Sequence, residues 1–339
     1  TAAGWNELAT PPPGAIGYAQ EGIVTHFADR LAAAVRRCGN PVMVGLDPRW
    51  EQLPACLRAD LDPRDLAAAA HAYGAFCRDV IDVVAPLVAV VKPQAAFFEQ
   101  LGPPGMAALA DVIAYASGAG LLVVVDGKRN DIGTTAAAYA EAYLGPGRLS
   151  VWGGDALTVS PYLGADSLEP FVELAVQRAA GIFVLVKTSN PGGGLFQDLV
   201  TTDGAALYQR VAAFVQQAAQ RTAGSCGYGA VGAVVGATYP EQLAALRQAM
   251  PNTWFLVPGY GAQGAGARDV RDAFDSTGLG AVVNNSRGII FAYQRREYQE
   301  RYHEAQWQLA VEAATRVMIE QLRSETPAGK LGKEITDEE

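Results

Sequence analysis

The stretch VVVDGKRNDIGTT, from Val123 to Thr135, joins an apolar run to a cluster of charged residues. Three consecutive valines are typical of a strand that is buried on both faces, as in a parallel sheet. Asp126, Lys128 and Asp131 follow where that strand ends, and an Ala-rich segment with helical spacing comes next. The stretch therefore predicts one strand-and-helix unit of an α/β fold, with charges gathered at the end of its strand.

The same alternation recurs along the whole chain. Short runs rich in Val and Ile cover 41–47, 87–93, 121–128, 156–160, 181–189, 229–237, 254–261 and 280–288. Segments with helical spacing are predicted near 65–84, 104–117, 134–144, 165–180, 204–222, 240–249 and 266–275. Eight such units predict a (β/α)8 TIM barrel. A doubly wound open sheet is the alternative, although no G-x-G-x-x-G follows an early strand.

The two ends of the chain depart from this pattern. Residues 1–22 contain PPPG and no clear period, which indicates an N-terminal arm. We expect an extra helix near 24–37, ahead of the first strand, and a long final helix over 290–323. A single catalytic domain is thus predicted over 23–325, followed by a disordered polar tail over 326–339.

Composition excludes several classes of function. The net charge is −9 and no basic run is present, so neither nucleic acid nor an anionic membrane is an expected partner. The four cysteines are widely spaced and form no C-x-x-C pair, which is typical of reduced thiols and not of a metal site. We see no secretory leader and no apolar run of about 18 residues. A cytoplasmic protein that holds no metal is therefore expected.

Charged and polar residues concentrate where the predicted strands end, and this end of a parallel barrel carries the active site. Asp126 and Lys128 lie two residues apart on one strand, so both side chains are expected to face the barrel mouth beside Lys92. The alternative is a structural ion-pair cluster that closes the barrel. Asp131 has its own alternative, because it precedes an Ala-rich helix that it could cap.

Two glycine-containing loops follow the last two predicted strands. PGYGAQG (258–264) is a turn that leads into a predicted helix, and NNSRG (284–288) supplies Arg287. Glycines let backbone N–H groups approach an anion, and arginine binds phosphate through two donors. Because loops after strands 7 and 8 are the usual phosphate site of this fold, we predict a phosphate site here. Ordinary turns with a surface arginine are the alternative.

These residues together resemble a known family. DGKRNDI matches the D-x-K-x-x-D-I signature of the orotidine 5′-phosphate decarboxylases, and GLD, VVKPQAAFFE, VLVKTSNP, PGYGAQG and NNSRG resemble segments of the family's longer bacterial branch. The resemblance covers about 40–295. It implies decarboxylation of orotidine 5′-monophosphate to uridine 5′-monophosphate, the last step of de novo pyrimidine synthesis, without a cofactor.

The resemblance also implies a role for each matching residue. The catalytic tetrad would be Lys92, Asp126, Lys128 and Asp131. Asp131, Ile132 and Thr135 would reach into the site of a neighbouring subunit, so a homodimer with shared active sites is expected. The implied substrate contacts are Asp47 and Lys92 for ribose, Gln94 after the lysine, Thr188 or Ser189 for the pyrimidine, and Tyr260, Gly261, Gln263, Arg287 and Gly288 for phosphate.

Chemistry supports this interpretation of the charges. Decarboxylation leaves an electron pair on ring carbon 6, which the Lys128 ammonium can stabilise and then protonate. Two unit charges ~4 Å apart interact by roughly 1 kcal/mol in water and about 4 kcal/mol at an effective dielectric near 20. Because enzyme accelerations span ~8–23 kcal/mol, preorganised charge and phosphate binding must supply the rest. Alternating signs are expected to keep the tetrad ionised without large pKa shifts.

Three other functions stay open at this point. The first is a metal-dependent sugar-phosphate decarboxylase or epimerase, which would carry Glu at the position of Asp126 and depend on magnesium. The second is a Schiff-base aldolase that uses Lys187. The third is a phosphoribosyl-ligand sensor without catalytic activity. The segments 48–63 and 188–202 are longer than ordinary connections, and such loops are often functional.

Overall fold

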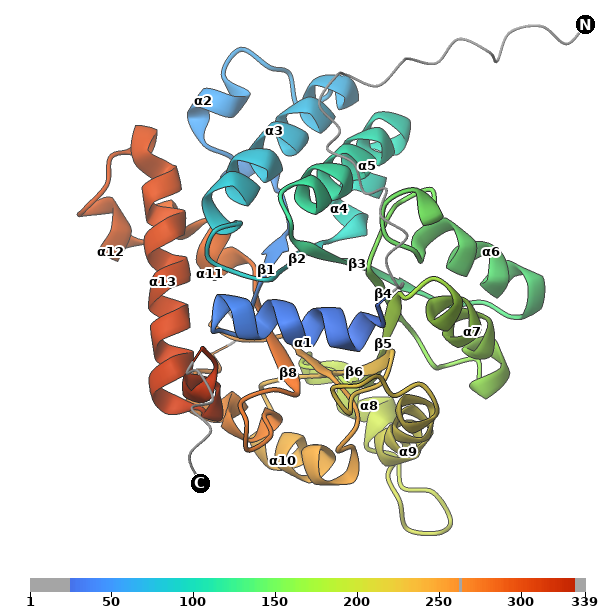
Figure 1. The fold of residues 1–339 in the computed structure, drawn as a ribbon. Coiled ribbons are helices and arrows are strands. Elements are labelled where there is room, and N and C mark those ends of the chain that lie inside the picture. Colours follow the sequence, from blue (N-terminus) through green and yellow to red (C-terminus); the bar gives the residue numbers. More distant parts are fainter. Residues whose placement is uncertain (1–24, 262–263, 333–339) are drawn as a thin grey trace, which may run out of the picture.

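The computed structural model describes residues 25–261 and 264–332. Its centre is a closed barrel of eight parallel strands in chain order, in which β8 pairs back to β1 (Figure 1). The strands are β1 (Val42–Leu46), β2 (Val90–Pro93), β3 (Leu122–Arg129), β4 (Ala156–Val159), β5 (Gly181–Lys187), β6 (Val231–Val235), β7 (Phe255–Val257) and β8 (Ala281–Asn285). The (β/α)8 barrel is confirmed, and each predicted run holds one strand.

An outer layer of helices covers the barrel. Its members are α3 (Leu66–Val84), α4 (Ala95–Glu99), α5 (Gly102–Gly118), α6 (Gly133–Tyr143), α7 (Glu169–Gln177), α9 (Leu207–Arg221) and α10 (Pro240–Ala249). The helix predicted over 266–275 is instead a 3-10 helix, η5 (Arg268–Ala273). Gly266 lies two residues before it and the Asp275–Gly278 turn follows it, so the helical segment is short.

The predicted extra helix is α1 (Phe27–Cys38), and it closes one end of the barrel (Figure 1). The ring of Phe27 meets the ring of Phe183 edge to face, with centroids 6.2 Å apart. A Cβ atom at Gly181 would lie 2.2 Å from the Phe27 ring, so this strand begins with glycine. Arg30 Nη1 lies 2.5 Å from the buried Asp155 carboxylate. Because these contacts lie where the strands begin, the opposite end stays open.

The final helix begins later than the predicted span of 290–323. The long helix α13 (Trp307–Glu325) begins at residue 307, after α11 (Arg287–Ile290), η6 (Ala292–Gln294), α12 (Arg296–Gln299) and η7 (Glu304–Gln306). The Tyr293 and Trp307 rings meet with centroids 5.9 Å apart, whereas one continuous helix would separate them by about 21 Å. The chain therefore folds back between them.

The predicted tail is ordered over its first residues. η8 (Pro327–Lys330) follows α13, and both Ala328 and Leu331 are buried. Two apolar residues in a polar stretch give no periodic signal, so the predicted start of the tail, at residue 326, is too early. The arm predicted over 1–22 and the last seven residues, 333–339, lie outside the described residues.

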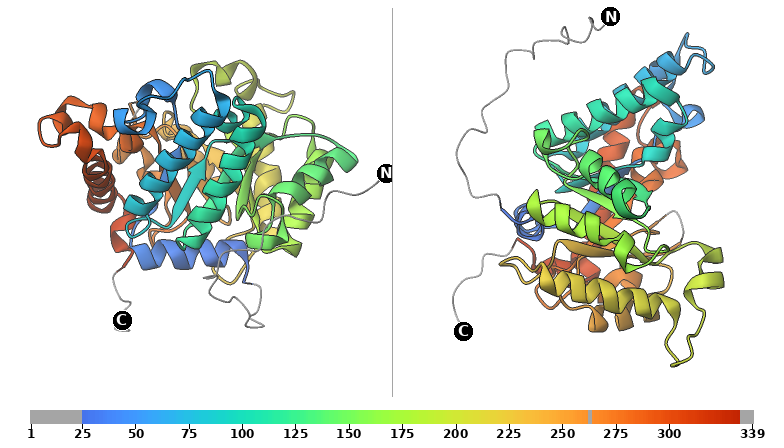
Figure 2. Two further views of the ribbon diagram at one scale, coloured as in Figure 1. Left: turned by 90° about the horizontal axis from the view of Figure 1, so that it is seen from above. Right: turned by 90° about the vertical axis from the view of Figure 1, so that its right-hand side faces the viewer.

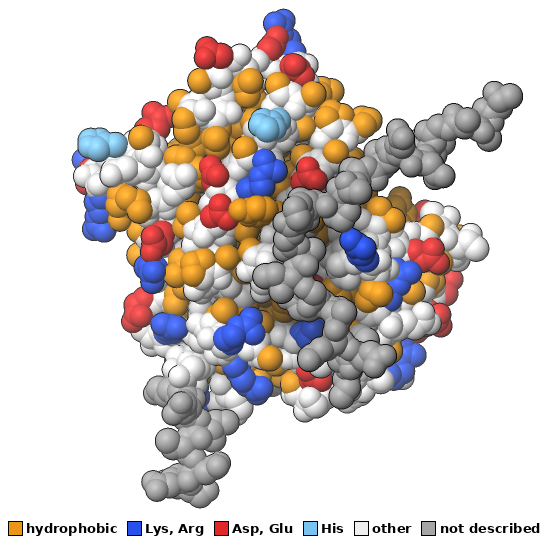
Figure 3. All heavy atoms as spheres, turned by 45° about the horizontal axis from the view of Figure 1, so that its top comes forward, with side chains coloured by type: hydrophobic (Ala, Val, Ile, Leu, Met, Phe, Trp, Pro, Cys, Tyr) orange, Lys and Arg blue, Asp and Glu red, His pale blue; other side chains and the backbone are white. Residues whose placement is uncertain are grey.

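The end of the barrel opposite α1 carries the long connections. Figure 2 shows α1 at one end of the molecule and the segments around α2 (Ala55–Arg58) and α8 (Gly194–Gln197) at the other. Charges of both signs are scattered over the face seen in Figure 3. Among the described residues, no helix combines the length and apolar content that crossing a membrane requires.

Candidate active site

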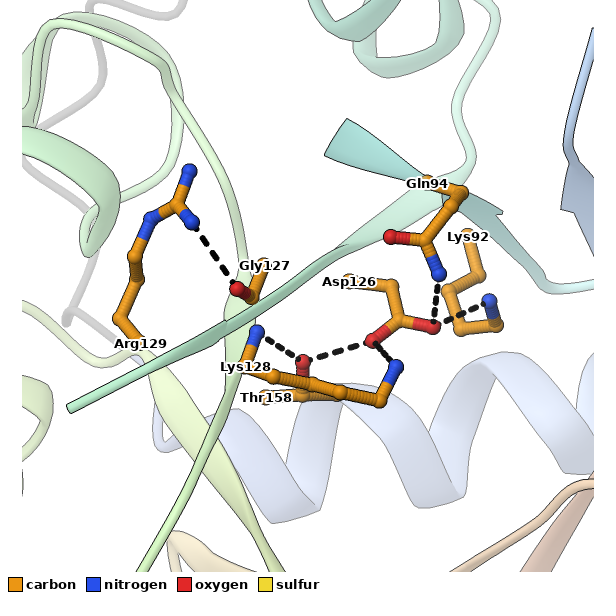
Figure 4. Close-up of polar contacts among 7 residues, drawn as sticks. All are labelled: Lys92, Gln94, Asp126, Gly127, Lys128, Arg129 and Thr158. Carbon is orange, nitrogen blue, oxygen red and sulfur yellow. Dashed lines mark hydrogen bonds and ion pairs between the residues drawn. The ribbon is translucent and has the colours of Figure 1, made fainter. Parts of the chain in front are cut away.

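A cluster of three charges lies at the C-terminal ends of β2 and β3. Lys92 Nζ is 2.8 Å from Asp126 Oδ2, and Lys128 Nζ is 2.6 Å from Asp126 Oδ1 (Figure 4). The side chains of Lys92 and Asp126 are buried, but that of Lys128 is 47% exposed. One carboxylate therefore holds two ammonium groups, of which the Lys128 group is the more exposed to a ligand.

Two neutral side chains complete the shell around Asp126. Gln94 Nε2 donates to Oδ2 at 2.9 Å, and Thr158 Oγ1 donates to Oδ1 at 2.8 Å. With the two lysines, four donors meet a group that offers about four acceptor positions, so the carboxylate cannot rotate freely. Sequence reasoning missed Thr158 on β4, whose signal was only its place in the ALTVS run next to β3.

Burial makes the charges of this cluster interact strongly. Burial alone would raise the pKa of Asp126, but the two lysines and their hydrogen bonds hold it well below its ordinary value. Burial lowers the pKa of Lys92, yet Asp126 and Asp47 outweigh that effect and raise it. Both groups thus stay ionised at neutral pH. The expectation of small pKa shifts is wrong for Asp126, because little water screens it.

Lys128 reaches the mouth through an irregularity in β3, not by regular alternation. Val125 pairs with Leu157 and Arg129 with Val159, so four residues of β3 span two of β4. The backbone φ of Lys128 is +45°, in the left-handed region that residues with side chains seldom adopt. Such strain costs on the order of 1–3 kcal/mol and clusters at functional sites. The irregularity directs Lys128 toward Asp126 while Arg129 points away (Figure 4).

The cluster lines a cavity of about 660 Å³. Asp47 and Asn284 also line it, and the Oδ1 atoms of both are buried without a hydrogen-bond partner among the described residues. Buried polar atoms are normally paired, so these two oxygens are available to a bound molecule. The predicted site residues that line the cavity are Asp47, Lys92, Gln94, Asp126, Lys128, Thr188, Ser189, Tyr260 and Arg287.

The predicted phosphate loops lie beside the cavity. Arg287 is exposed and lines both this cavity and an adjoining one, whereas Gly261 and Gly288 line only the second. Tyr260 Oη donates to Gln321 Oε1 at 2.7 Å, so its hydroxyl is directed at α13. Burial raises the pKa of Tyr260 to about 12. Gln263 lies outside the described residues.

The segment 188–202 forms one wall of the cavity. Thr188 Oγ1 donates to Asn190 Oδ1 and accepts from Gln197 Nε2, both at 2.7 Å. Lys187, the candidate for a Schiff base, does not line the cavity: it is buried, and its Nζ lies 2.5 Å from Asp198 Oδ1. Its ammonium also lies near the Tyr239 ring, 4.7 Å from the centroid.

Comparisons with known proteins agree with this geometry. Residues 40–302 match the model of the Orotidine 5'-phosphate decarboxylase / HUMPS family. The chain belongs to this family. An orotidine 5'-phosphate decarboxylase of Rhodopirellula baltica is 60% identical over 300 residues, which cover 88% of this chain and 99% of the relative. One of Caldicellulosiruptor bescii is 39% identical over 277 residues, 79% of this chain and 90% of the relative. The Leishmania donovani OMP decarboxylase structure has a TM-score of 0.67 at 33% identity and covers 89% of this chain and 98% of its own.

The fold brings only part of the D-x-K-x-x-D-I signature of this family member into the cavity. Asp126 and Lys128 line the cavity, whereas Asp131, Ile132 and Thr135 do not. Ile132 is 56% exposed, and among the residues that the structure describes Asp131 Oδ1 accepts only from the adjacent Ile132 N, at 2.8 Å. α6 begins at Gly133 with Ile132 as its N-cap, so the alternative that Asp131 caps this helix is wrong.

Proposed function

We propose that the chain converts orotidine 5′-monophosphate to uridine 5′-monophosphate, the last step of de novo pyrimidine synthesis. The single observation that carries this proposal is the half-exposed Lys128 ammonium, held by the buried Asp126, in the same cavity as Arg287. The names of the relatives support the choice of substrate. No substrate carboxylate is needed to hold Lys128 in place, because Asp126 already does so.

The cavity offers a partner for each part of this nucleotide. Arg287 suits the phosphate, which its guanidinium can bind through two donors. Asp47 Oδ1 has no hydrogen-bond partner within the described part of the chain and, with Lys92, suits the ribose hydroxyls. The hydroxyl of Thr188 is engaged within its own segment, so Ser189 is the better candidate for the pyrimidine.

The reaction follows from the position of Lys128. The bond between ring carbon 6 and the carboxylate breaks, carbon dioxide leaves, and the electron pair stays on carbon 6. The Lys128 ammonium stabilises this pair and then transfers a proton to carbon 6, after which water reprotonates the amine. At an effective dielectric near 20 a charge ~4 Å away contributes about 4 kcal/mol, or roughly 10³-fold in rate. Fixed partners make that contribution available without reorganisation.

We also propose a homodimer in which the second copy supplies Asp131, Ile132 and Thr135. Apolar side chains are exposed on this side: Ile132 follows β3, and Tyr162, 78% exposed, follows β4. The two strand ends are neighbours, because Ser160 N donates to Arg129 O at 2.9 Å. A second copy would cover this surface and bring a further carboxylate to Lys128.

We propose a cytoplasmic location because the cysteines are free thiols. All four are free in the structure, as expected where thiols stay reduced. Burial raises the pKa of Cys226 to about 11 and that of Cys77 further still, so both thiols are neutral at physiological pH.

The test follows the absorbance of orotidine 5′-monophosphate with purified protein in EDTA, with and without added magnesium. We expect equal decarboxylation in both conditions. Activity that appears only with magnesium would instead support the metal-dependent sugar-phosphate enzyme. Borohydride with substrate should leave Lys187 unlabelled, since that lysine lies outside the cavity. If the protein binds the nucleotide but does not convert it, only the function of a phosphoribosyl-ligand sensor remains.

A further inference from the structure

Thr158 lies at the end of β4 and contacts both catalytic residues of β3. Thr158 is 1% exposed and lines the cavity. Thr158 Oγ1 donates to Asp126 Oδ1 at 2.8 Å and accepts from the backbone N–H of Lys128 at 2.9 Å (Figure 4). One hydroxyl therefore joins the carboxylate to the backbone that carries the ammonium.

The direction of both bonds is fixed by chemistry. A backbone N–H can only donate and an ionised carboxylate can only accept, so the single hydroxyl proton of Thr158 must point at Asp126. Because the hydroxyl is both donor and acceptor, no apolar side chain can take its place. Serine is the nearest residue that keeps both bonds.

The backbone of Lys128 has particular need of such a partner. β3 leaves regular pairing with β4 between Val125 and Arg129, and Lys128 lies within that interval at φ +45°. Conformations of this kind persist only where surrounding contacts hold them. The irregular pairing with β4 leaves the Lys128 N–H free, and the Thr158 hydroxyl accepts a hydrogen bond from it. Lys128 is also the residue whose ammonium must be directed at the substrate.

We propose that Thr158 is a positioning residue for the decarboxylation: its hydroxyl fixes the Lys128 backbone and the Asp126 carboxylate in one arrangement. The inference rests on the proposed function. It predicts that loss of the hydroxyl lowers kcat and leaves KM nearly unchanged, because Thr158 acts on the two groups that stabilise the transition state and not on the phosphate.

The test compares Thr158→Val, which keeps the shape, with Thr158→Ser, which keeps the hydroxyl. We expect kcat to fall about 10- to 100-fold for valine, as for small misplacements of catalytic groups, and to recover to within about 3-fold of wild type for serine. Thr315→Val is the matched control. Thr315 is fully buried in α13, and its hydroxyl bonds the Val311 carbonyl. We expect Thr315→Val to have a lower melting temperature than wild type and an unchanged kcat.

Three results would overturn the inference: an unchanged kcat in Thr158→Val, a rise confined to KM, or a loss that serine does not recover. If Thr158→Val does not fold, Thr158→Ala provides the same comparison with a smaller side chain. An inactive wild-type protein would contradict the proposed function instead. Activity in the wild type and in Thr158→Val alike would contradict only the role of Thr158.

Discussion

At the scale of single residues, the Asp126 carboxylate fixes the positions of the two lysines in the site. It holds Lys92 and Lys128 at 2.8 and 2.6 Å and receives two more hydrogen bonds from neutral donors. Lys92 is buried, so removing the carboxylate would leave its ammonium without its hydrogen-bonded partner. The stability of this end of the barrel therefore depends on the ionisation of one side chain.

We expect Asp126→Asn to lower the free energy of unfolding by about 3 kcal/mol at pH 7, as for broken buried ion pairs. The pKa of Asp126 is lower in the folded state than in the unfolded chain, whose value is about 3.9. Its contribution is therefore complete above pH ~4 and is lost as the pH falls toward the folded pKa. The difference between variant and wild type should shrink in that range.

Urea unfolding at pH 7, 5 and 3 measures this difference. Asp111→Asn is the matched control, because Asp111 is exposed on α5. A difference for Asp126→Asn that is the same at all three pH values would contradict a depressed pKa.

The sequence allowed the charged residues to be predicted but not their neighbours. Lysines and aspartates at strand ends are conspicuous, since charge is costly to bury without a purpose. Thr158 and Asn284 are ordinary polar residues whose importance depends on which strands are adjacent. Gln94 was expected to bind substrate, and the structure shows it bonded to Asp126.

At the scale of elements, α1 covers the end of the barrel where the strands begin, opposite the candidate site. We expect Phe27→Ala to lower the free energy of unfolding by about 3–5 kcal/mol, because the Phe27 ring fills space against Phe183 and over Gly181. Activity well below the melting temperature should persist, since α1 lies at the closed end. Leu309→Ala, at a position 44% exposed, should cost far less. A large loss of kcat in folded Phe27→Ala would contradict this separation.

An ion pair between the buried Lys187 and the partly exposed Asp198 anchors the segment 188–202. Asp198→Asn leaves Lys187 buried without its carboxylate, and we expect a loss of about 2 kcal/mol. This value lies below that for fully buried pairs because Asp198 is 45% exposed. The segment should also be cleaved sooner in limited proteolysis. Asp203→Asn is the control, since its pair with Arg210 is exposed on both sides. Equal cleavage of both variants would show that Lys187 anchors nothing.

Periodicity predicted the elements better than it predicted their breaks. Buried strands and amphipathic helices repeat a pattern over many residues, so all eight strands were located. The fold-back before α13 brings Tyr293 against Trp307, and the irregularity in β3 is accompanied by the bond from the Lys128 N–H to Thr158. Neither contact leaves a repeating signal in the sequence.

At the scale of the whole molecule, we expect two chains to share each site. We predict that mixing inactive Lys128→Ala and Asp131→Ala chains restores about a quarter of wild-type activity. Half of the dimers would be hybrids, each with one intact site of two. Lys128→Ala mixed with Asp126→Asn is the control, because both defects lie on the same side of every site and should restore nothing. Absence of recovery in the first mixture would show that Asp131 does not cross between chains.

The most direct measurement is the decarboxylation of orotidine 5′-monophosphate in EDTA by wild type, Lys128→Met and Lys330→Met. Lys330 is exposed, follows α13 and bonds only the Ser276 carbonyl among the described residues. We predict that Lys330→Met matches wild type and that Lys128→Met loses about 10³-fold or more in kcat, the cost of removing a preorganised charge from the transition state. Turnover by Lys128→Met at a rate near that of wild type would contradict the account.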